Sequence, residues 1–532
     1  MARRHPPGQR WTSRRMNLQE AAARAPFDLL VIGGGINGAA VAREAAIRGL
    51  RVALFEQDDL GFGTTWRSTR LIHGGLRYLE HGEVGLVFES LRERGHLLRE
   101  RPHLVKPQPF VLPGGRFSRR PSWQMRIGLT AYDLLATGGG LPRHQSLTSA
   151  EVQHAVPGLG QKAPGGFSFY DARAVAPERI ALELALEARD HGALIANHAS
   201  VTTIGHTDGL VTGVTVVHRG EEFEFRGNHV INAAGPWVDA VNNTTGARLP
   251  RILGTTRGTH IAIELPAPLP DAAVLATARS DGRVFFALPH SGLLLVGTTD
   301  VRDEGDPGFV SPTRREAEYL LGEAQSLLPD YGITADMVRY AYAGLRPLLA
   351  SSRGPESAIT RKHAVVNHAK AGGPAGLYSV AGGKLSTYQP LAREALRAIG
   401  IHWGSNRATR PPARLAAGPG LEGRVLDHID RYGHAALAIL GNAGRVICEH
   451  AGAVTAEISH AVRSELAASL SDVLMRRTGI ALHACRGLCC HREAAEIMAS
   501  LLGWDASETA QQIAAYERDV AHHLAEWSDL SG

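Results

Sequence analysis

Cysteine is scarce in this sequence, with four residues among 532, and three of the four lie close together near the C-terminal end. So few cysteines cannot form the disulfide framework of a small secreted domain, and they fit a reducing compartment. Long apolar runs are also missing, because glycine and charged residues interrupt every stretch before it reaches the roughly eighteen residues of a membrane-spanning helix. The chain is therefore not expected to span a membrane.

Charge of one sign is only weakly in excess. The net charge is +5 and 44% of the 532 residues are hydrophobic, which is typical of two or three globular domains. This mild basic balance suits a phosphorylated substrate or an anionic lipid surface, and it does not indicate nucleic acid as a partner. Residues 1–25 contain six arginines but no apolar segment, which argues against a secretory signal. We interpret them as a disordered basic extension, in which Met16 is a second candidate start.

The stretch from Phe27 to Glu56 combines a strand, a glycine turn, a helix and a second strand. Gly33, Gly35 and Gly38 form the pattern G-x-G-x-x-G directly after an apolar run. Gly33 would permit the tight turn, Gly35 would let the backbone approach a pyrophosphate, and Gly38 would let the helix pack close to the strand. Glu56 would accept a hydrogen bond from a ribose hydroxyl. The stretch predicts a dinucleotide site, and the motif alone leaves FAD and NAD open.

Two later stretches also lead from a strand into a glycine turn. They are residues 230–235, VINAAG, and residues 377–387, LYSVAGGKLST, which place a lysine at the turn. Residues 61–79, GFGTTWRSTRLIHGGLRYL, group hydroxyl, basic and glycine residues directly after the first unit. Such polar groups are costly to bury unless they bind something. We expect the three stretches to line one site.

The remaining segments differ in pattern. Residues 250–347 have the β-branched and aromatic density of a sheet. Residues 100–165 are rich in Pro, Arg and Gly and are expected to be irregular, with one helix near residues 123–135. A linker near residues 405–420 precedes a tail that is expected to be wholly helical, with Asp505 capping its last helix.

Seven motifs occur together in one order: VIGGGINGAA, LIHGGLRYLE, INAAGPWV, GTTD, GLRPL, ITR and GGKLSTY. In this order and spacing the chain resembles the FAD-dependent glycerol-3-phosphate dehydrogenases, which belong to the D-amino-acid-oxidase-like flavoproteins. The resemblance covers about residues 26–400 and, more loosely, the helical tail. The chain departs from the pattern in its basic extension, in Trp66 and Arg67, and in the cysteine cluster.

The resemblance implies an α/β (α+β) fold in which a Rossmann-like FAD-binding domain carries an inserted antiparallel-sheet substrate domain and a C-terminal helical cap. The expected FAD-binding domain comprises residues 26–100, 165–249 and 360–404. The expected substrate domain comprises residues 101–164 and 250–359, and the helical domain residues 421–532.

The resemblance also implies which residues hold FAD. They are Gly33, Gly34, Gly35, Ile36, Asn37, Gly38 and Glu56 at the adenosine end, Thr64, Thr65 and Ser68 along the middle, Ala234, Gly235, Gly383, Lys384, Leu385, Ser386 and Thr387 near the ring, and Val201 as a further contact.

Oxidation of glycerol 3-phosphate at C2 requires a hydride acceptor, a group that takes the hydroxyl proton, and cations that hold the phosphate. The resemblance implies a substrate site formed by Arg77, Tyr78, Arg346, Arg361 and Lys384. His73, Arg346 and Lys384 are the candidate catalytic residues. His73 is the candidate base because imidazole titrates near neutral pH, and a purely structural His73 is the alternative.

No metal site is predicted, because the spacing C-x-x-x-C-C-H of Cys485, Cys489, Cys490 and His491 lacks the paired pattern of common zinc sites. The resemblance implies that the product is dihydroxyacetone phosphate and that the electrons pass to a membrane quinone. An oxidase that uses oxygen and a related amine oxidase are the alternatives among enzymes, and a non-catalytic flavoprotein is the alternative outside them. We expect a cytoplasmic protein held peripherally at the inner face of the cell membrane, and a homodimer stays open.

Overall fold

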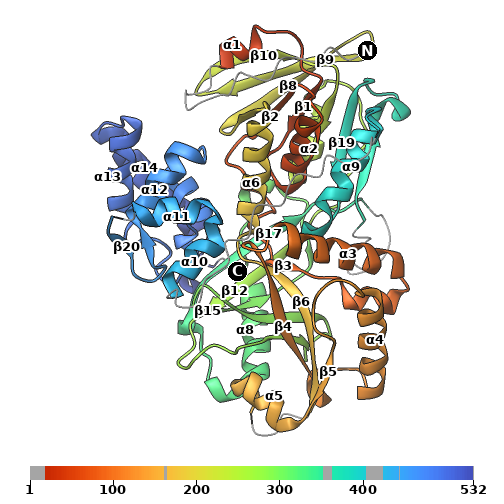
Figure 1. The fold of residues 1–532 in the computed structure, drawn as a ribbon, viewed down its shortest axis with the longest axis vertical. Helices are drawn as coiled ribbons and strands as arrows, with labels where there is room; N and C mark the ends of the chain where they lie inside the picture. Colours follow the sequence, from red (N-terminus) through yellow and green to blue (C-terminus); the bar gives the residue numbers. More distant parts are fainter. Residues whose placement is uncertain (1–17, 161–164, 351–361, 403–422, 443, 531–532) are drawn as a thin grey trace.

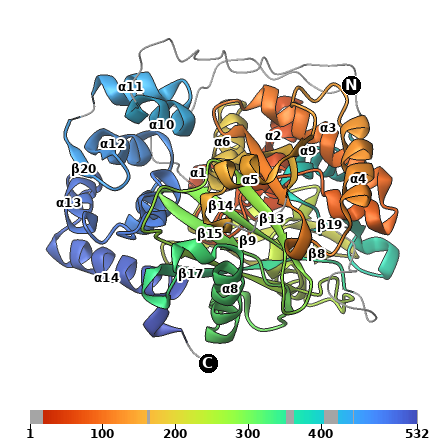
Figure 2. The ribbon, with the colours of Figure 1, turned by 90° about the horizontal axis from the view of Figure 1, so that it is seen from below.

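The computed structural model describes residues 18–160, 165–350, 362–402, 423–442 and 444–530. Figure 1 shows three parts: a sheet flanked by helices at the top, a large sheet below it, and a helical C-terminal part, drawn in blue, beside both. Figure 2, seen from below, shows the C-terminal part standing to one side of the two sheets. The predicted α/β fold with a C-terminal helical domain is confirmed.

The upper part is built on a six-stranded sheet in the order β18-β19-β11-β1-β2-β7. Its strands are β1 (Leu29–Ile32), β2 (Val52–Phe55), β7 (Leu194–Ala196), β11 (Val230–Asn232), β18 (Ala364–Asn367) and β19 (Leu377–Ala381), and all pairs are parallel except β18 with β19. Helices α2 (Ile36–Ile47), α6 (Pro177–Asp190) and α9 (Tyr388–Ala398) pack on one face. A parallel sheet buried on both faces requires continuous apolar strands, which is why β1 reads LLVI.

A smaller sheet covers the other face. Its strands are β8 (Ala199–Thr207), β9 (Leu210–His218) and β10 (Glu221–Arg226). Successive residues of β1 point to opposite faces, so Leu29 packs with the helices and Leu30 packs with the small sheet. Helix α1 (Leu18–Ala22) joins the same core through Leu18. The prediction that residues 1–25 are disordered is therefore wrong for residues 18–22, because their apolar side chains are buried; residues 1–17 lie outside the described part.

The lower part is a ten-stranded, mostly antiparallel sheet. Its strands are β3 (Leu71–Ile72), β4 (Val105–Pro113), β5 (Gln145–Leu147), β6 (Gly166–Ala174), β12 (Thr256–Ile263), β13 (Ala273–Thr277), β14 (Val284–His290), β15 (Leu293–Gly297), β16 (Val301–Arg302) and β17 (Val338–Arg346). Helix α8 (Arg314–Leu327) packs on one face, and α3 (Val84–Glu100) and α4 (Ser122–Leu135) pack on the other. Two short helices, α5 (Ser149–Ala155) and α7 (Val238–Asn243), lie in the connections.

Strand β4 was not expected, because Pro107, Pro109 and Pro113 suggested irregular chain. The structure pairs all of β4 with β6, whereas β13 on the other side pairs only at residues 110–111. A proline lacks an N–H donor, so it is tolerated where the strand has no partner on that side. The helix expected near residues 123–135 is present as α4. Strand β6 falls in the range 165–249 that the sequence grouped with the FAD-binding domain, yet it belongs to the ten-stranded sheet.

The C-terminal part is not wholly helical. It contains α10 (Gly423–Tyr432), α11 (Ala435–Gly441), α12 (Thr455–Ser464), α13 (His491–Leu502) and α14 (Ala506–His523), and also a hairpin of β20 (Val446–Cys448) and β21 (Ala453–Val454). A π-helical segment spans Asp472–Arg477. The predicted cap of α14 is confirmed, because the Asp505 side chain accepts a hydrogen bond from the Glu508 N–H at 2.8 Å. Among the described residues, no helix is both long and apolar enough to cross a bilayer.

Buried ion pairs join the C-terminal part to the upper part. Asp59 is fully buried and accepts from Arg476 Nε at 2.6 Å and from two nitrogens of Arg477 at 2.7 Å. Arg179 of α6 binds Glu465 through two hydrogen bonds, of 2.6 and 3.1 Å. Removing one partner of such a pair leaves an uncompensated buried charge, which is strongly destabilising. These contacts therefore fix the C-terminal part against the upper part.

His198 contributes a pH-dependent contact at the same interface. Its Nε2 lies 2.9 Å from Oδ2 of Asp472. Burial alone would lower the pKa of His198, but the Asp472 carboxylate, with Asp59 and Asp58, raises that pKa to about 9. A raised pKa means that the contribution to stability is full below the unfolded value of about 6.5 and is lost as pH rises through 9.

We therefore predict that His198→Gln lowers the melting temperature at pH 6 but has little effect at pH 10. The difference at pH 6 should correspond to about 1–2 kcal/mol, since the imidazole is partly exposed. Thermal melts of both proteins across this range measure it. His154→Gln changes an exposed histidine outside the interface and should leave the curve unchanged. A His198→Gln effect that grows with pH would contradict the assignment.

Candidate active site

Residues from both large sheets line one cavity of about 1140 Å³. Of the predicted cofactor residues, the cavity is lined by Gly33, Gly35, Ile36, Asn37, Glu56, Thr64, Thr65, Ser68, Val201, Ala234, Gly235, Gly383, Lys384, Leu385 and Ser386. His73, Tyr78 and Arg346 line it as well. The cavity thus brings together stretches that are more than 300 residues apart in the sequence.

The first glycine turn forms one end of the cavity. Gly33 has a φ of +104°, and a Cβ there would lie 2.6 Å from the Ala233 carbonyl oxygen. A Cβ on Gly38 would lie 1.9 Å from the Gly33 oxygen. Gly38 therefore serves the packing of the turn. Neither Gly34 nor Gly38 lines the cavity, whereas Gly35, at the N-terminus of α2, does line it. Unpaired N–H groups at a helix N-terminus favour a phosphate.

Glu56 directly follows β2 and is buried. Its Oε2 accepts from the Gly34 N–H at 2.6 Å, and its Oε1 accepts from the Asp58 N–H at 2.9 Å. Burial raises the pKa of Glu56 to about 7, although these N–H groups oppose the rise. Each carboxylate oxygen has a second lone pair, so Glu56 can hold the turn and still accept a ribose hydroxyl.

The loop with Thr64, Thr65 and Ser68 runs between the first turn and β17. Thr65 Oγ1 accepts from the Ile36 N–H at 3.1 Å, and Thr64 Oγ1 donates to the Leu345 carbonyl at 2.6 Å. The Ser68 carbonyl accepts from the Tyr342 hydroxyl at 2.8 Å. The loop is thus fixed both to the first glycine turn and to β17, the strand that leads to Arg346.

The third glycine turn brings Lys384 to the other end of the cavity. Lys384 Nζ donates to Ser90 Oγ at 2.9 Å and lies 4.3 Å from the centre of the Tyr78 ring. Thr387, which does not line the cavity, accepts from the Lys384 N–H at 3.2 Å and so orients the turn. A Cβ on Gly75 would lie 2.2 Å from the Tyr78 ring, so glycine is required at this position for Tyr78 to lie beside Lys384.

Arg346 is the last residue of β17. Its guanidinium donates to Thr298 Oγ1 at 2.9 Å and to the Thr299 carbonyl at 3.2 Å, and Asp300 Oδ1 lies at 3.2 Å. These three residues belong to the GTTD motif. Gly258 leaves room for the guanidinium, because a Cβ there would lie 2.2 Å from it. The planar group is therefore oriented before any ligand binds.

A buried network holds the turn that follows His73. The Gly74 N–H donates to the Tyr132 hydroxyl at 2.9 Å, and that hydroxyl lies 2.8 Å from Asp171 Oδ2. Arg94 pairs with the same carboxylate. Neither Tyr132 nor Asp171 was predicted from the sequence, because their separation from residue 74 gives no local signal. The network fixes the backbone that carries His73 and Tyr78.

His260 is a further cavity residue that sequence reasoning missed. It lies on β12, its Nε2 is 2.9 Å from Thr69 Oγ1, and its ring stacks on Tyr342. Burial lowers the pKa of His260 to about 3, and the positive charges of Arg346 and Arg70 add to the effect. The imidazole is neutral at physiological pH, but so low a pKa makes it a weak proton acceptor. It falls within residues 250–347, which were predicted to form a sheet, but no spacing marked it as a site residue.

Two predicted substrate residues are not placed. Arg361 lies outside the described residues, as does the side chain of Arg77. Their roles stay predictions, as does the choice of His73 as the base.

The glycine turns that line the cavity fit a dinucleotide. Among the described residues, a Cβ added at Gly35 would meet only Thr65 Oγ1, at 3.4 Å, so it would point into the cavity. Gly235 has a φ of +56°, which keeps the second turn tight beside the same space. The fold, the three glycine turns and the two cations that line the cavity, Arg346 and Lys384, together define a dinucleotide-dependent oxidoreductase.

Comparison with known proteins specifies this class. A family model described as FAD dependent oxidoreductase matches residues 28–389, and a model described as C-terminal domain of alpha-glycerophosphate oxidase matches residues 394–509. The chain therefore belongs to the family of FAD-dependent oxidoreductases, and FAD is its cofactor. The resemblance seen in the sequence motifs is confirmed.

The chain is similar to several characterised relatives. It is 35% identical over 428 residues to a glycerol-3-phosphate dehydrogenase of Synechocystis sp., which covers 77% of this chain and 76% of that protein. It is 34% identical to a glycerol-3-phosphate dehydrogenase of Mycobacterium leprae, over 96% and 92% of the two chains. The glycerol-3-phosphate dehydrogenase of Bacillus halodurans, solved with FAD, superposes with a TM-score of 0.75 at 27% identity, over 95% and 97%.

We predict that Gly35→Val folds normally but purifies without FAD. Its side chain meets open cavity in the apoprotein and would occupy the pyrophosphate position in the holoprotein. Absorbance of the flavin per protein, together with the melting temperature of the apoprotein, measures the two effects separately. Gly33→Val should instead fail to fold, because its Cβ would meet Ala233.

Gly322→Val is the matched control for this prediction. Gly322 is exposed on α8, and a Cβ there has no neighbour within 4 Å among the described residues. This variant should retain the full flavin content. Gly35→Val protein that purifies with one FAD per chain would contradict the placement of the pyrophosphate.

Proposed function

We propose that this chain oxidises sn-glycerol 3-phosphate at C2 to dihydroxyacetone phosphate. The observation that supports the proposal is that Arg346 and Lys384 face the same cavity as the three glycine turns that hold FAD. A cavity that combines a flavin cradle with oriented cations suits an anionic alcohol. The names of the relatives from Synechocystis, Mycobacterium and Bacillus support the same substrate.

FAD supplies the hydride acceptor when bound. The chain's own residues bind and orient the substrate. Arg346, held by Thr298 and Asp300, suits two oxygens of a phosphate, and Lys384 adds a second positive charge across the cavity. His73 takes the proton of the C2 hydroxyl, and Tyr78 covers the ammonium of Lys384 and excludes water from it. His260 remains neutral and supports the pocket beside Arg346.

Arg346→Ala tests whether Arg346 binds the phosphate of the substrate. A charge-assisted contact to phosphate contributes on the order of 1.5–3 kcal/mol, so kcat/KM for glycerol 3-phosphate should fall roughly ten- to more than a hundredfold. Glycerol lacks the phosphate, so the weak activity on glycerol should be almost unchanged, and flavin content should stay normal. Steady-state kinetics on both substrates measure the difference.

Arg339→Ala is the matched control, because Arg339 lies on the same strand but is exposed and pairs with Glu264 at the surface. It should leave both activities unchanged. Equal losses on glycerol and glycerol 3-phosphate in Arg346→Ala would assign this arginine to the fold or the hydride step. Arg361→Ala is expected to behave as Arg346→Ala does.

We further propose that the electrons pass to a membrane quinone and that the protein binds peripherally at the inner face of the cell membrane. An exposed apolar face supports this proposal. We define the α3–α4 face by its five exposed apolar residues: Val84, Phe88, Trp123, Ile127 and Leu134, which are 49% to 69% exposed. Such a group of side chains on neighbouring helices suits a lipid surface.

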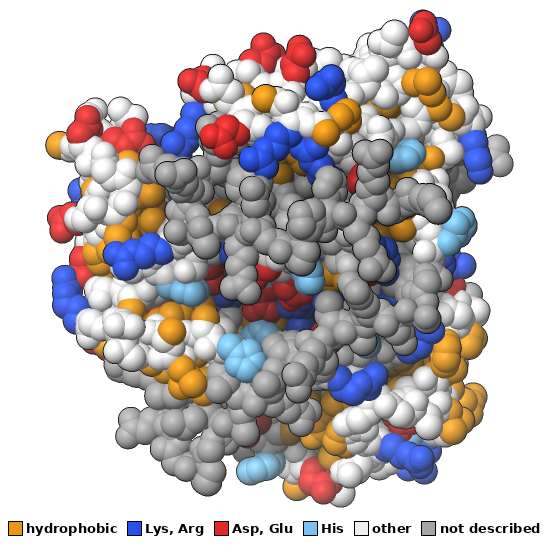
Figure 3. Space-filling model, turned by 45° about the horizontal axis from the view of Figure 1, so that its top comes forward, with side chains coloured by type: hydrophobic (Ala, Val, Ile, Leu, Met, Phe, Trp, Pro, Cys, Tyr) orange, Lys and Arg blue, Asp and Glu red, His pale blue; other side chains and the backbone are white. Residues whose placement is uncertain are grey.

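The α3–α4 face adjoins the cavity. Val84 and Ile127 belong to the face and also line the cavity, so an apolar electron acceptor could enter from the lipid side. Arg119 and Arg126, which are exposed on or just before α4, suit anionic head groups. On the described part of the view in Figure 3, acidic, basic and apolar side chains are interspersed.

We predict that Phe88→Ser/Trp123→Ser binds vesicles that contain anionic lipids roughly tenfold or more weakly, since each buried aromatic contributes about 1.5–3 kcal/mol. Reduction of a quinone embedded in the vesicles should fall in parallel, while activity with a water-soluble dye and flavin content stay normal. Phe309→Ser removes an exposed aromatic residue outside the face and is the control. Unchanged sedimentation with vesicles, or rapid oxygen consumption without quinone, would favour the oxidase alternative.

A further inference from the structure

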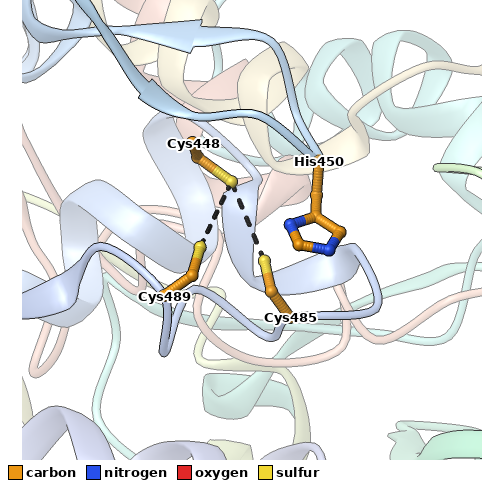
Figure 4. Close-up of side chains that lie close together, drawn as sticks. All are labelled: Cys448, His450, Cys485 and Cys489. Carbon is orange, nitrogen blue, oxygen red and sulfur yellow. Dashed lines mark hydrogen bonds between the residues drawn. The ribbon is translucent and has the colours of Figure 1, made fainter.

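The four cysteines of this chain all lie in the C-terminal part, and three of them converge with a histidine. Cys448 ends β20, and His450 lies in the turn of the β20–β21 hairpin. Cys485 and Cys489 lie in the turns just before α13. Figure 4 shows the three sulfur atoms close together, with the imidazole of His450 beside them. None of these residues belongs to the cavity described above.

The distances in this cluster suit one tetrahedral ion. The sulfur of Cys448 lies 3.7 Å from that of Cys485 and 3.6 Å from that of Cys489. All four ligand atoms, including one from His450, lie within 4.8 Å of one another. A zinc–sulfur distance of about 2.3 Å requires sulfur atoms about 3.8 Å apart in a tetrahedron. The observed separations are therefore those that a single ion needs.

The turn that carries two of the ligands is held by hydrogen bonds of its own. The Leu488 N–H donates to the Cys485 carbonyl at 2.9 Å, and the Tyr516 hydroxyl donates to the Arg486 carbonyl at 2.6 Å. Gly487 has a φ of +73°, and a Cβ there would lie 2.2 Å from the Tyr516 oxygen. Glycine is therefore required at this position. A ligand turn fixed in this way loses little freedom when an ion binds.

The local sequence spacing concealed this set. Cys490 and His491, which completed the pattern C-x-x-x-C-C-H, do not belong to the four residues whose ligand atoms lie within 4.8 Å of one another. Cys490 is buried at the start of α13 with its sulfur 3.6 Å from the Gly487 carbonyl, and His491 Nε2 lies 2.9 Å from Glu517. The other two ligands come from Cys448 and His450, more than 30 residues earlier. Only the fold brings the two pairs together.

A second group of metal-ligating residue types does not compete. Asp59, His198 and Asp472 also lie close together, but Arg476 and Arg477 already neutralise the carboxylates through buried ion pairs. A cation there would have to displace these arginines. The cysteine cluster is therefore the stronger candidate.

We propose that Cys448, His450, Cys485 and Cys489 bind one Zn²⁺ ion, which joins the β20–β21 hairpin to the turn before α13. Three thiolates and an imidazole are a ligand set that Zn²⁺ takes in structural sites, and with four protein ligands the site has no open position for catalysis. The three thiols release their protons on binding, and no redox step is involved. The ion stabilises the C-terminal part, so its removal lowers the melting temperature without removing FAD.

The test uses the full-length holoenzyme expressed with added zinc. Metal analysis by mass spectrometry should find one zinc per chain, and Cys489→Ser and Cys485→Ser should each retain less than about a tenth of it. Cys489 is exposed, so its replacement by serine should not disturb the fold, and unchanged flavin content checks this. Cobalt substituted for zinc should show the visible absorption of a tetrahedral thiolate site, weakened in His450→Ala.

Cys490→Ser is the matched control, because it changes the adjacent cysteine outside the ligand set, and it should keep the full zinc content. A chelator should lower the melting temperature of the wild type by several degrees and should have no effect on Cys489→Ser. Wild-type protein that holds no zinc while its FAD content is full would overturn the proposal. So would stoichiometric iron with sulfide, or zinc lost from Cys490→Ser and kept in His450→Ala.

Discussion

The close approach of the first glycine turn to its neighbours is the constraint on which the rest of the structure depends. A Cβ on Gly33 would lie 2.6 Å from the Ala233 carbonyl oxygen, and one on Gly38 would lie 1.9 Å from the Gly33 oxygen. Because neither glycine carries a Cβ, β1, β11 and α2 can meet at the carboxyl ends of the parallel strands. Ligands of such sheets bind beyond the carboxyl ends of the strands, so this packing decides where the cavity opens. The ten-stranded sheet then closes the cavity from the other side.

The C-terminal part helps to hold that closure. Trp66 is buried and stacks on Tyr342 of β17, and Arg67 lies 3.2 Å from His523 of α14. These two residues are a departure from the family's pattern within the loop of Thr64, Thr65 and Ser68, which we call the flavin loop. Their contacts show a physical reason for the departure, because they tie the loop to both the sheet and the C-terminal part. Together with the ion pairs of Asp59, they make the C-terminal part a support of the flavin loop.

The parts that could be predicted from the sequence are those in which one short stretch contains all the residues that form the structural element or mark the site. The βαβ unit, the glycine turn at Lys384 and the cation Arg346 are of this kind. His260, Tyr132 and Asp171 could not be found, because each acts on a segment distant in the sequence. Strand β4 was missed for another reason: its prolines exclude hydrogen bonds on one side only, and a sequence does not show which side is open.

Strand β17 shows how the separate parts depend on one element. At one end the Tyr340 hydroxyl donates to the Leu482 carbonyl at 2.7 Å, just before the turn that carries Cys485. In the middle Tyr342 holds the flavin loop, and at the other end Arg346 faces the cavity. Tyr340 and Tyr342 of this strand belong to the same hydrophobic core as many buried side chains of the C-terminal part. A shift of the C-terminal part along β17 would therefore disturb apolar packing before it reached the substrate end, and the buried ion pairs of Asp59 and Arg179 oppose that shift.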